Sequence, residues 1–111
     1  MRPRALWLPY EVADLDRAHR FWTVHLGLSQ VDGWERDGER GVVLRAADAA
    51  FVELVSGPDR PGPPAFEMAG EAEVDAVAAA LGGQAHRYPR GHYGFTVRGP
   101  AGAPVMVWSE R

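Results

Sequence analysis

Two stretches of the chain show the apolar spacing of a helix with one buried face. The first predicts a helix over residues 15–26, with Phe21 at the margin of a stripe formed by Leu15, Ala18, Trp22 and Leu26. Asp14 precedes it as an N-cap, and Gly27 ends it as a left-handed cap. The second predicts a helix over 71–81, which two glycines end and whose apolar stripe is Val74, Val77, Ala78 and Leu81.

The other apolar segments are short and flanked by turn residues, as strands are. Asp37-Gly38 marks a hairpin turn between two of them, and residues 99–102 mark a second turn. The predicted strands are 5–12, 29–35, 41–46, 50–55, 65–69, 84–88, 94–98 and 104–108.

A Pro/Gly linker at 57–64 separates two modules, residues 1–56 and 65–111, with the same order of predicted elements. Tyr10-Glu11-Val12-Ala13 in the first module matches Phe66-Glu67-Met68-Ala69, 56 residues later. Each module reads β-α-β-β-β. We therefore predict one α+β domain over residues 1–111, in which two such modules form curved mixed sheets around a cup.

Composition limits the chemistry. The chain has no Cys and no Lys, because all 12 basic residues are Arg, which excludes thiol, thiolate-metal and Schiff-base chemistry. The net charge of −3, with both signs interspersed, provides no electrostatic footprint for nucleic acid or for an anionic membrane. Neither a membrane-length apolar run nor a signal-peptide core is visible, so we expect a cytoplasmic protein.

Several motifs accompany this order of elements. They are Val12-Ala13-Asp14-Leu15-Asp16-Arg17-Ala18, Phe21-Trp22-Thr23, Leu26-Gly27-Leu28-Ser29 and Phe95-Thr96-Val97-Arg98-Gly99-Pro100-Ala101-Gly102. Together they resemble the vicinal-oxygen-chelate superfamily, also called the glyoxalase/bleomycin resistance/dioxygenase superfamily. The Phe-Trp-Thr triplet and the late Arg-x-Pro-Ala-Gly sequence are most similar to the bleomycin resistance proteins. That resemblance implies a homodimer, in which the N-terminal strand can exchange between subunits.

The resemblance also implies four metal-ligand positions, a His on the first strand and an acidic residue on the last strand of each module. Glu53 keeps one acid, whereas Trp7 and Met106 stand at two other positions and the fourth falls at or beside Pro63. A divalent ion held through one protein carboxylate is weakly bound and largely hydrated. We therefore predict no metal and no other cofactor, and a metal-dependent glyoxalase or dioxygenase is the least favoured interpretation.

The histidines provide no clear metal site either. His19 and His25 lie six residues apart on the first predicted helix and do not share a face, so we take them as exposed or rim residues. His86 and His92 flank a Tyr-Pro-Arg-Gly loop without a convincing third ligand. Their role stays open between a metal pair and, for His92, a place at the mouth of a pocket.

The aromatic residues point to ligand binding instead. Four Trp is a large number for 111 residues, and only Trp22 has an evident place in a helix core. Strand alternation puts Trp7 on the face where relatives hold a metal ligand. Met106 and Trp108 share the corresponding face of the last strand, and Phe51 and Glu53 share it on strand 50–55. Such a surface suits a flat conjugated ligand, although the same side chains are also able simply to fill the cup. The predicted ligand-binding residues are Trp7, Trp34, Phe51, Glu53, Tyr93, Met106 and Trp108.

The favoured function is metal-independent binding that sequesters an aromatic natural product or antibiotic, similar to bleomycin resistance. The alternative is a metal-free isomerase, cyclase or lyase with Glu53 as general base, whose pKa we expect an apolar cup to raise, and with Tyr93 or His92 as partner. The acidic segment 32–39 and the scattered Arg residues are interpreted as solvated surface. In a protein that sequesters an antibiotic, Glu35, Asp37 and Glu39 are alternatively candidates to attract a cationic drug. The sequence does not identify the ligand.

Overall fold

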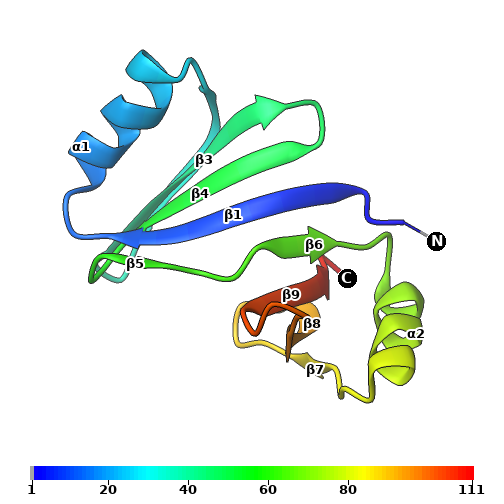
Figure 1. The fold of residues 1–111 in the computed structure, drawn as a ribbon. Helices are drawn as coiled ribbons and strands as arrows, with labels where there is room; N and C mark the ends of the chain where they lie inside the picture. The colour runs from blue at the N-terminus through cyan, green and yellow to red at the C-terminus, as the bar shows by residue number, and fades with distance from the viewer. Residues whose placement is uncertain (1) are drawn as a thin grey trace. The chain divides into compact units, whose positions relative to one another are not determined.

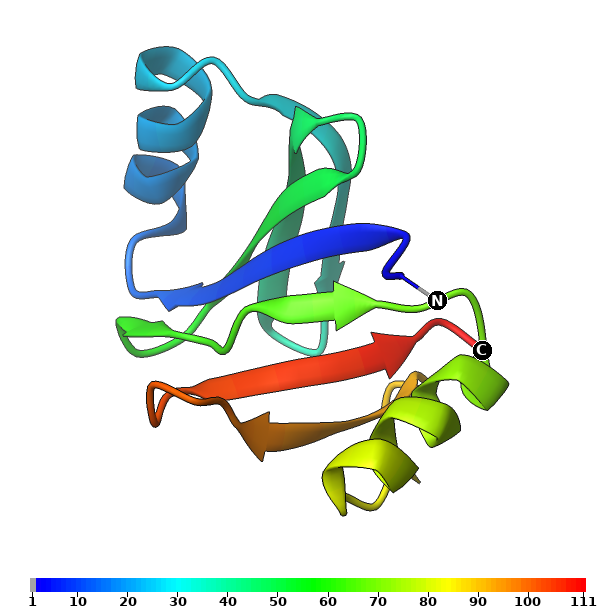
Figure 2. The same cartoon turned by 45° about the vertical axis from the view of Figure 1, so that its right-hand side comes forward.

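A computed structural model describes residues 2–111 and divides them into two compact units. The first, called the N-terminal unit, is Trp7–Gly62. The second, called the C-terminal unit, combines residues 2–6 with Pro63–Arg111. Figures 1 and 2 show the elements of each unit. No helix within residues 2–111 is long and apolar enough to cross a membrane.

The N-terminal unit is a sheet with one helical segment. Its strands run in the order β2-β3-β4-β1, with the short β5 beside β1. The β2–β3 turn has positive φ angles at Asp37 and Gly38, as the predicted hairpin requires. The elements are β1 (Ala5–Val12, whose first two residues belong to the C-terminal unit), α1 (Leu15–Arg20), η1 (Phe21–His25), β2 (Ser29–Arg36), β3 (Glu39–Ala47), β4 (Ala50–Ser56) and β5 (Arg60–Pro61).

The helical segment begins where the sequence predicted. The Asp14 carboxylate accepts from the Arg17 amide at 3.0 Å, so the expected N-cap is confirmed. The segment ends as the π-helical turn η1, in which the Leu26 amide donates to the Phe21 carbonyl five residues back. A π turn breaks the 3.6-residue period. Leu26 is consequently 55% exposed, and its predicted place on the buried stripe is wrong.

The α1 side of this sheet carries the core of the N-terminal unit. Leu15 of α1 packs with Leu44, Val52 and Leu54 of β3 and β4. Partly buried residues surround this cluster: Leu8, Tyr10, Val12, Ala18, Trp22, Leu28 and Val42. The predicted core position of Trp22 is confirmed.

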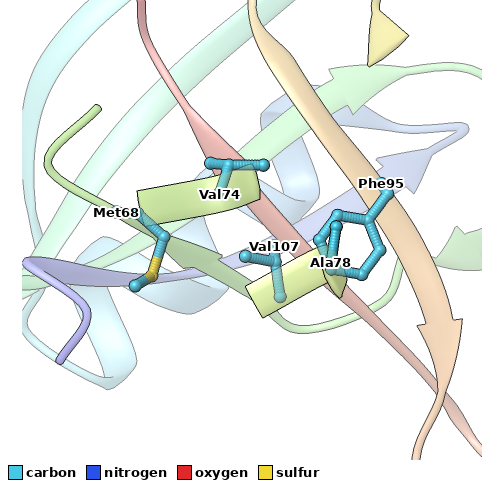
Figure 3. Close-up of a cluster of buried hydrophobic side chains, with 5 residues drawn as sticks. All are labelled: Met68, Val74, Ala78, Phe95 and Val107. Atoms are coloured by element: carbon cyan, nitrogen blue, oxygen red, sulfur yellow. The ribbon is translucent and has the colours of Figure 1, made fainter. Parts of the chain in front are cut away.

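The C-terminal unit repeats the plan with its strands in the order β6-β9-β8-β7. The β6–β9 pair is parallel and the other pairs are antiparallel. Helix α2 contacts β8 and β9, and Figure 3 shows the core between them: Met68, Val74, Ala78, Phe95 and Val107. The elements are β6 (Ala65–Glu67), α2 (Glu71–Leu81), β7 (His86–Arg87), β8 (Tyr93–Arg98) and β9 (Pro104–Ser109).

The α+β class and the β-α-β-β-β order of both modules are therefore confirmed, as are the bounds of α2 and its left-handed cap at Gly82. Leu81 is exposed rather than part of the α2 stripe. The predicted linker contains β5, where Pro61 is tolerated because β5 pairs only with β1. The expected strand at 84–88 is reduced to the two residues of β7.

Candidate functional site

The sheet of the N-terminal unit has a second face, opposite α1, which carries four of the seven predicted ligand-binding residues: Trp7, Trp34, Phe51 and Glu53. In the β3–β4 register, Val43 pairs with Glu53 and Arg45 pairs with Phe51. Because successive residues of a strand point to opposite faces, these four side chains lie on the side away from the core residues Leu44, Val52 and Leu54. Trp7 and Trp34 join them, and we call this surface the N-terminal aromatic face.

An aromatic pair lies on this face. The Trp7 indole stacks on the Phe51 ring with centroids 4.6 Å apart and ring planes 26° apart. Both side chains are half-buried. Offset stacking of this kind fixes both rings and leaves their remaining surface to another flat group. Strand alternation predicted a shared face for these two residues, and the structure shows that they are in direct contact.

Trp34 lies at the β2–β3 end of the same face. It pairs with Gly41, and a Cβ on that glycine would lie 2.1 Å from Cζ2 of the indole. The ring therefore covers the backbone of β3 at a place where only glycine leaves room. Its Nε1 donates to the Glu39 carboxylate at 3.3 Å, which sets the orientation of the ring.

Glu53 is the acidic residue between these aromatic groups. It is half-buried and lies opposite Val43, which is buried and forms the apolar floor at this point. Asp32 pairs with Val43 from the other side, so Val43 lies between two acidic residues. A carboxylate beside an apolar floor is able to accept a hydrogen bond from a ligand or to pair with a ligand cation.

The C-terminal unit has a corresponding face opposite α2. Met106 pairs with Ala65 and Thr96, and Trp108 pairs with Glu67 and Gly94. The intervening Val107 belongs to the α2 core, so Met106 and Trp108 share the opposite face, as strand alternation predicted. Trp108 again lies beside a glycine, because a Cβ on Gly94 would lie 2.8 Å from the Trp108 Cβ.

A column of rings adjoins Trp108. The His92 ring meets Trp108 edge-on at 5.8 Å and stacks on Tyr88 at 4.5 Å, and His86 contacts the same tyrosine ring at 4.4 Å. Burial is the main cause that lowers the pKa of His92 below 6.5; Arg90 and His86 lower it further, and Glu110 opposes them. Both imidazoles contact Tyr88. Within residues 2–111, no group of three or more His, Asp or Glu is placed to hold a metal ion.

Tyr93 occupies a different place from the other candidates. It packs against the α2 core, and its hydroxyl donates to the Asp75 carboxylate at 2.6 Å. That hydrogen bond is the main cause that raises the Tyr93 pKa above 10.0. Tyr93 therefore lies on the face opposite Met106 and Trp108, and we leave it out of the site proposed below. The alternation of Tyr93, Phe95 and Val97 is the sequence signal that indicates this orientation.

Glu67 is a buried acid that the sequence analysis did not select. It lies beside Trp108 on the C-terminal face, its side chain is only 8% exposed, and the Arg4 guanidinium is 3.6 Å away. The 56-residue repeat contains the signal for this pair, because Arg4 and Glu67 correspond to Arg60 and Glu11. Arg60 in turn pairs with Glu11.

The residues at the superfamily's metal positions do not fit a divalent cation. The Trp7 side chain is an indole in van der Waals contact with Phe51, and Met106 offers a thioether. Hard divalent cations take side-chain carboxylate oxygens and transition-metal ions also take imidazole nitrogens, and among the side chains at these positions Glu53 alone provides such a ligand. We therefore derive no chemical step through a metal.

No family model and no curated relative matches the sequence. Solved structures do match it. A methylmalonyl-CoA epimerase from Mycobacterium tuberculosis is 20% identical over 98% of this chain and 89% of its own, with a TM-score of 0.67. A Streptomyces coelicolor methylmalonyl-CoA epimerase variant in complex with 2-nitronate-propionyl-CoA is 15% identical over 98% of both chains, with a TM-score of 0.71.

A third match is a glyoxalase/bleomycin resistance protein/dioxygenase superfamily member from Vibrio splendidus 12B01. It is 17% identical over 94% of this chain and 97% of its own, with a TM-score of 0.60. At these identities, the similarity establishes a shared fold and leaves the activity to be argued from the residues.

Proposed function

Because this chain has the fold of the glyoxalase/bleomycin resistance/dioxygenase superfamily, we propose that it is a binding protein that sequesters a planar aromatic small molecule without a metal or other cofactor. The observation that carries the proposal is the Trp7–Phe51 stack on the N-terminal aromatic face, with Glu53 on the same face. Stacking and apolar burial provide affinity for a flat ligand, and the carboxylate provides orientation.

Three other predicted ligand-binding residues belong to the proposed binding surfaces. Trp34 extends the N-terminal aromatic face, and Met106 and Trp108 provide a second apolar and aromatic surface in the C-terminal unit. An aromatic antibiotic is the proposed ligand class, because binding lowers the free concentration of a drug without any turnover. We also propose that the protein is a cytoplasmic homodimer. Sedimentation equilibrium tests the dimer, because it measures the mass of the particle in solution.

Bleomycin and a panel of planar aromatic antibiotics provide the first test, through tryptophan fluorescence and calorimetry. We expect at least one compound to change the emission and to bind stoichiometrically. Phe51→Leu should weaken that binding about tenfold, because it removes one partner of the stack. Phe21→Leu is the matched control, since Phe21 is an exposed phenylalanine of η1. Unchanged emission and no heat with every compound would rule the binding function out.

A second candidate function is favoured by the similarity to methylmalonyl-CoA epimerases over nearly the whole chain. In this candidate, the Glu53 carboxylate removes a proton from the carbon next to a thioester carbonyl, which leaves an enolate. A proton from solvent then adds to the opposite face of that carbon, and the Glu53 carboxyl returns its proton to solvent. The reaction is an isomerisation with general-base catalysis and no net change in composition.

Exchange of that proton for deuterium tests this candidate. Methylmalonyl-CoA is incubated in D₂O with protein that has been treated with a chelator, and the proton signal is followed by NMR. We expect exchange with the native chain and its loss in Glu53→Gln, with calorimetric binding kept. Absence of exchange with the native chain at any protein concentration removes the candidate and leaves the binding function standing.

A further inference from the structure

The N-terminal aromatic face carries a positive charge that the sequence analysis treated as solvated surface. Arg45 of β3 lies directly opposite Phe51 of β4 in the strand register. Its guanidinium carbon is 5.9 Å from the centroid of the Phe51 ring, within the range of a cation–π contact. The same ring stacks on Trp7. Arg45 is therefore part of the aromatic group and not a side chain that simply extends into solvent.

The contacts of Arg45 differ from those of two other arginines in this unit. Arg40 lies within ion-pair distance of Asp16 and Glu35, and Arg60 pairs with Glu11. For Arg45, the contact that the structure describes within residues 2–111 is the Phe51 ring, with no carboxylate. The side chain is exposed, so a ligand can reach its N–H donors.

A guanidinium that is held against a ring and exposed to solvent is able to bind an anion. Its planar fork matches the two oxygens of a carboxylate or the oxygens of a phosphate. Contact with the ring reduces the freedom of the long side chain before a ligand arrives, which lowers the entropic cost of binding. Glu53 occupies the next position of this face along β4 after Phe51. This face therefore carries both a positive and a negative side chain next to the aromatic pair.

We propose that Arg45 determines ligand specificity by binding an anionic group, a carboxylate or phosphate, on a planar aromatic ligand whose ring packs against Trp7 and Phe51. The proposal rests on the binding function above and narrows it from aromatic compounds in general to aromatic acids. It assigns a role to a residue outside the superfamily's metal positions. The acidic residues of the same face then repel a second anionic group, so a ligand with one anionic end is preferred.

Two probes with the same ring system test the proposal. 2-Naphthoate carries a carboxylate, and 2-naphthamide replaces it with a neutral amide of nearly the same shape. Binding to the native chain is measured by calorimetry and by NMR of the Arg45 Nε–Hε signal at low ionic strength. We expect 2-naphthoate to bind about tenfold more tightly than 2-naphthamide and to shift the Arg45 signal, because a charge-assisted hydrogen bond is made only with the acid.

Three variants connect this preference with Arg45. Arg45→Gln should bind both probes equally, and Arg45→Lys, which keeps the charge but loses the planar fork, should show a smaller preference. Arg20→Gln is the matched control, because Arg20 is an exposed arginine of α1, and it should keep the full preference. A 2-naphthyl phosphate arm shows whether the receptor favours phosphate over carboxylate.

The outcomes separate the two proposals. Equal affinity of the native chain for 2-naphthoate and 2-naphthamide overturns the role of Arg45 and leaves aromatic binding standing. A preference that persists in Arg45→Gln also overturns it. If neither naphthalene probe nor any antibiotic of the panel binds, the binding function itself fails and the inference falls with it.

Discussion

At the residue scale, two glycines make room for two tryptophan side chains. Gly41 faces the Trp34 indole, and Gly94 faces the Cβ of Trp108. Both glycines lie within strands, where glycine ordinarily weakens a sheet because it has no side chain to pack. At Gly41 the missing Cβ leaves space for the Trp34 indole, whereas at Gly94 it leaves space for the Val107 carbonyl oxygen and for the backbone and Cβ of Trp108. A glycine therefore lies opposite a tryptophan in each sheet, but only Gly41 makes room for an indole ring.

Gly41→Ala should displace the Trp34 ring. The new Cβ would lie 2.1 Å from the indole, so the ring must swing away and lose its hydrogen bond to Glu39. We expect a red shift of tryptophan emission and a loss of about 1–3 kcal/mol in the free energy of unfolding.

Gly33→Ala is the control for that substitution. It lies in the same β2–β3 ladder, but its Cβ would meet the flexible Gln30 amide at 3.0 Å. A Gly41→Ala protein with native emission and native stability would contradict the proposed fit between Trp34 and Gly41.

His92 predicts a pH dependence of stability. Its pKa in the folded chain is lowered from 6.5, mainly by burial, so the unfolded chain takes up this proton first as the pH falls. The contribution of neutral His92 to stability is therefore complete above pH 6.5 and is lost as the pH falls through 6.5 towards the folded pKa.

Urea unfolding at several pH values and an NMR titration of the imidazole test this prediction. We expect the native chain to lose stability below pH 6.5 and His92→Phe, which keeps a ring beside Tyr88, to lose less. A measured His92 pKa at or above 6.5 would contradict the buried, ring-packed position.

At the scale of elements, sequence patterns predicted both bounds of α2, the Asp14 N-cap of α1 and the left-handed Gly27, because capping is a local property. They did not predict that the first helical segment ends as the π turn η1. In this turn the Thr23 hydroxyl donates to the His19 carbonyl. Such competition for carbonyls does not appear in an apolar periodicity.

Asp14→Ala should destabilise the N-terminal unit. The substitution removes the carboxylate that accepts from the Arg17 amide and leaves that amide without its capping partner. We expect a loss of about 1 kcal/mol in the free energy of unfolding. Asp48→Ala, at an exposed turn, is the control with the same change of charge. Equal stability of these two proteins in urea would show that the cap contributes nothing.

At the scale of the whole molecule, each compact unit includes a short segment from the other half of the sequence. Residues 2–6 belong to the C-terminal unit, where the Arg4 amide donates to the Glu67 carbonyl at 2.7 Å. Residues 57–62 belong to the N-terminal unit, where Arg60 pairs with Glu11. The two ion pairs therefore occupy equivalent positions of the 56-residue repeat, and each joins segments that are far apart in the sequence.

These two pairs predict unequal effects of the same substitution. The arginines are similarly exposed, at 64% for Arg4 and 66% for Arg60, but the Glu67 side chain is 8% exposed and that of Glu11 is 36% exposed. Arg4→Ala removes the ion-pair partner of a buried carboxylate, so we expect a loss of about 1–3 kcal/mol, against about 0–1 kcal/mol for Arg60→Ala.

Chemical denaturation of both variants provides the measurement, at low and at high salt. The Arg60→Ala effect should decrease with salt because that pair is more exposed. An Arg60→Ala protein that is less stable than the Arg4→Ala protein would contradict the larger contribution of the Arg4–Glu67 ion pair.

The sequence by itself determined the order of elements, the α2 bounds and the faces of Trp7, Phe51, Met106 and Trp108. These depend on periodicity and on turn chemistry within short segments, where the nearest residues dominate the free energy. The alternation of Tyr93 with Phe95 also indicates which face Tyr93 occupies, although the sequence analysis placed Tyr93 among the ligand-binding residues.

Only the tertiary structure decided the contacts between distant segments. The Trp34–Gly41 fit, the Arg45–Phe51 contact and the burial of Glu67 beside Arg4 depend on which residues face each other across strands. Strand register and the exchange of segments between modules set these neighbours. They follow from the packing of the complete units, because a local pattern specifies the face of a residue but not its partner.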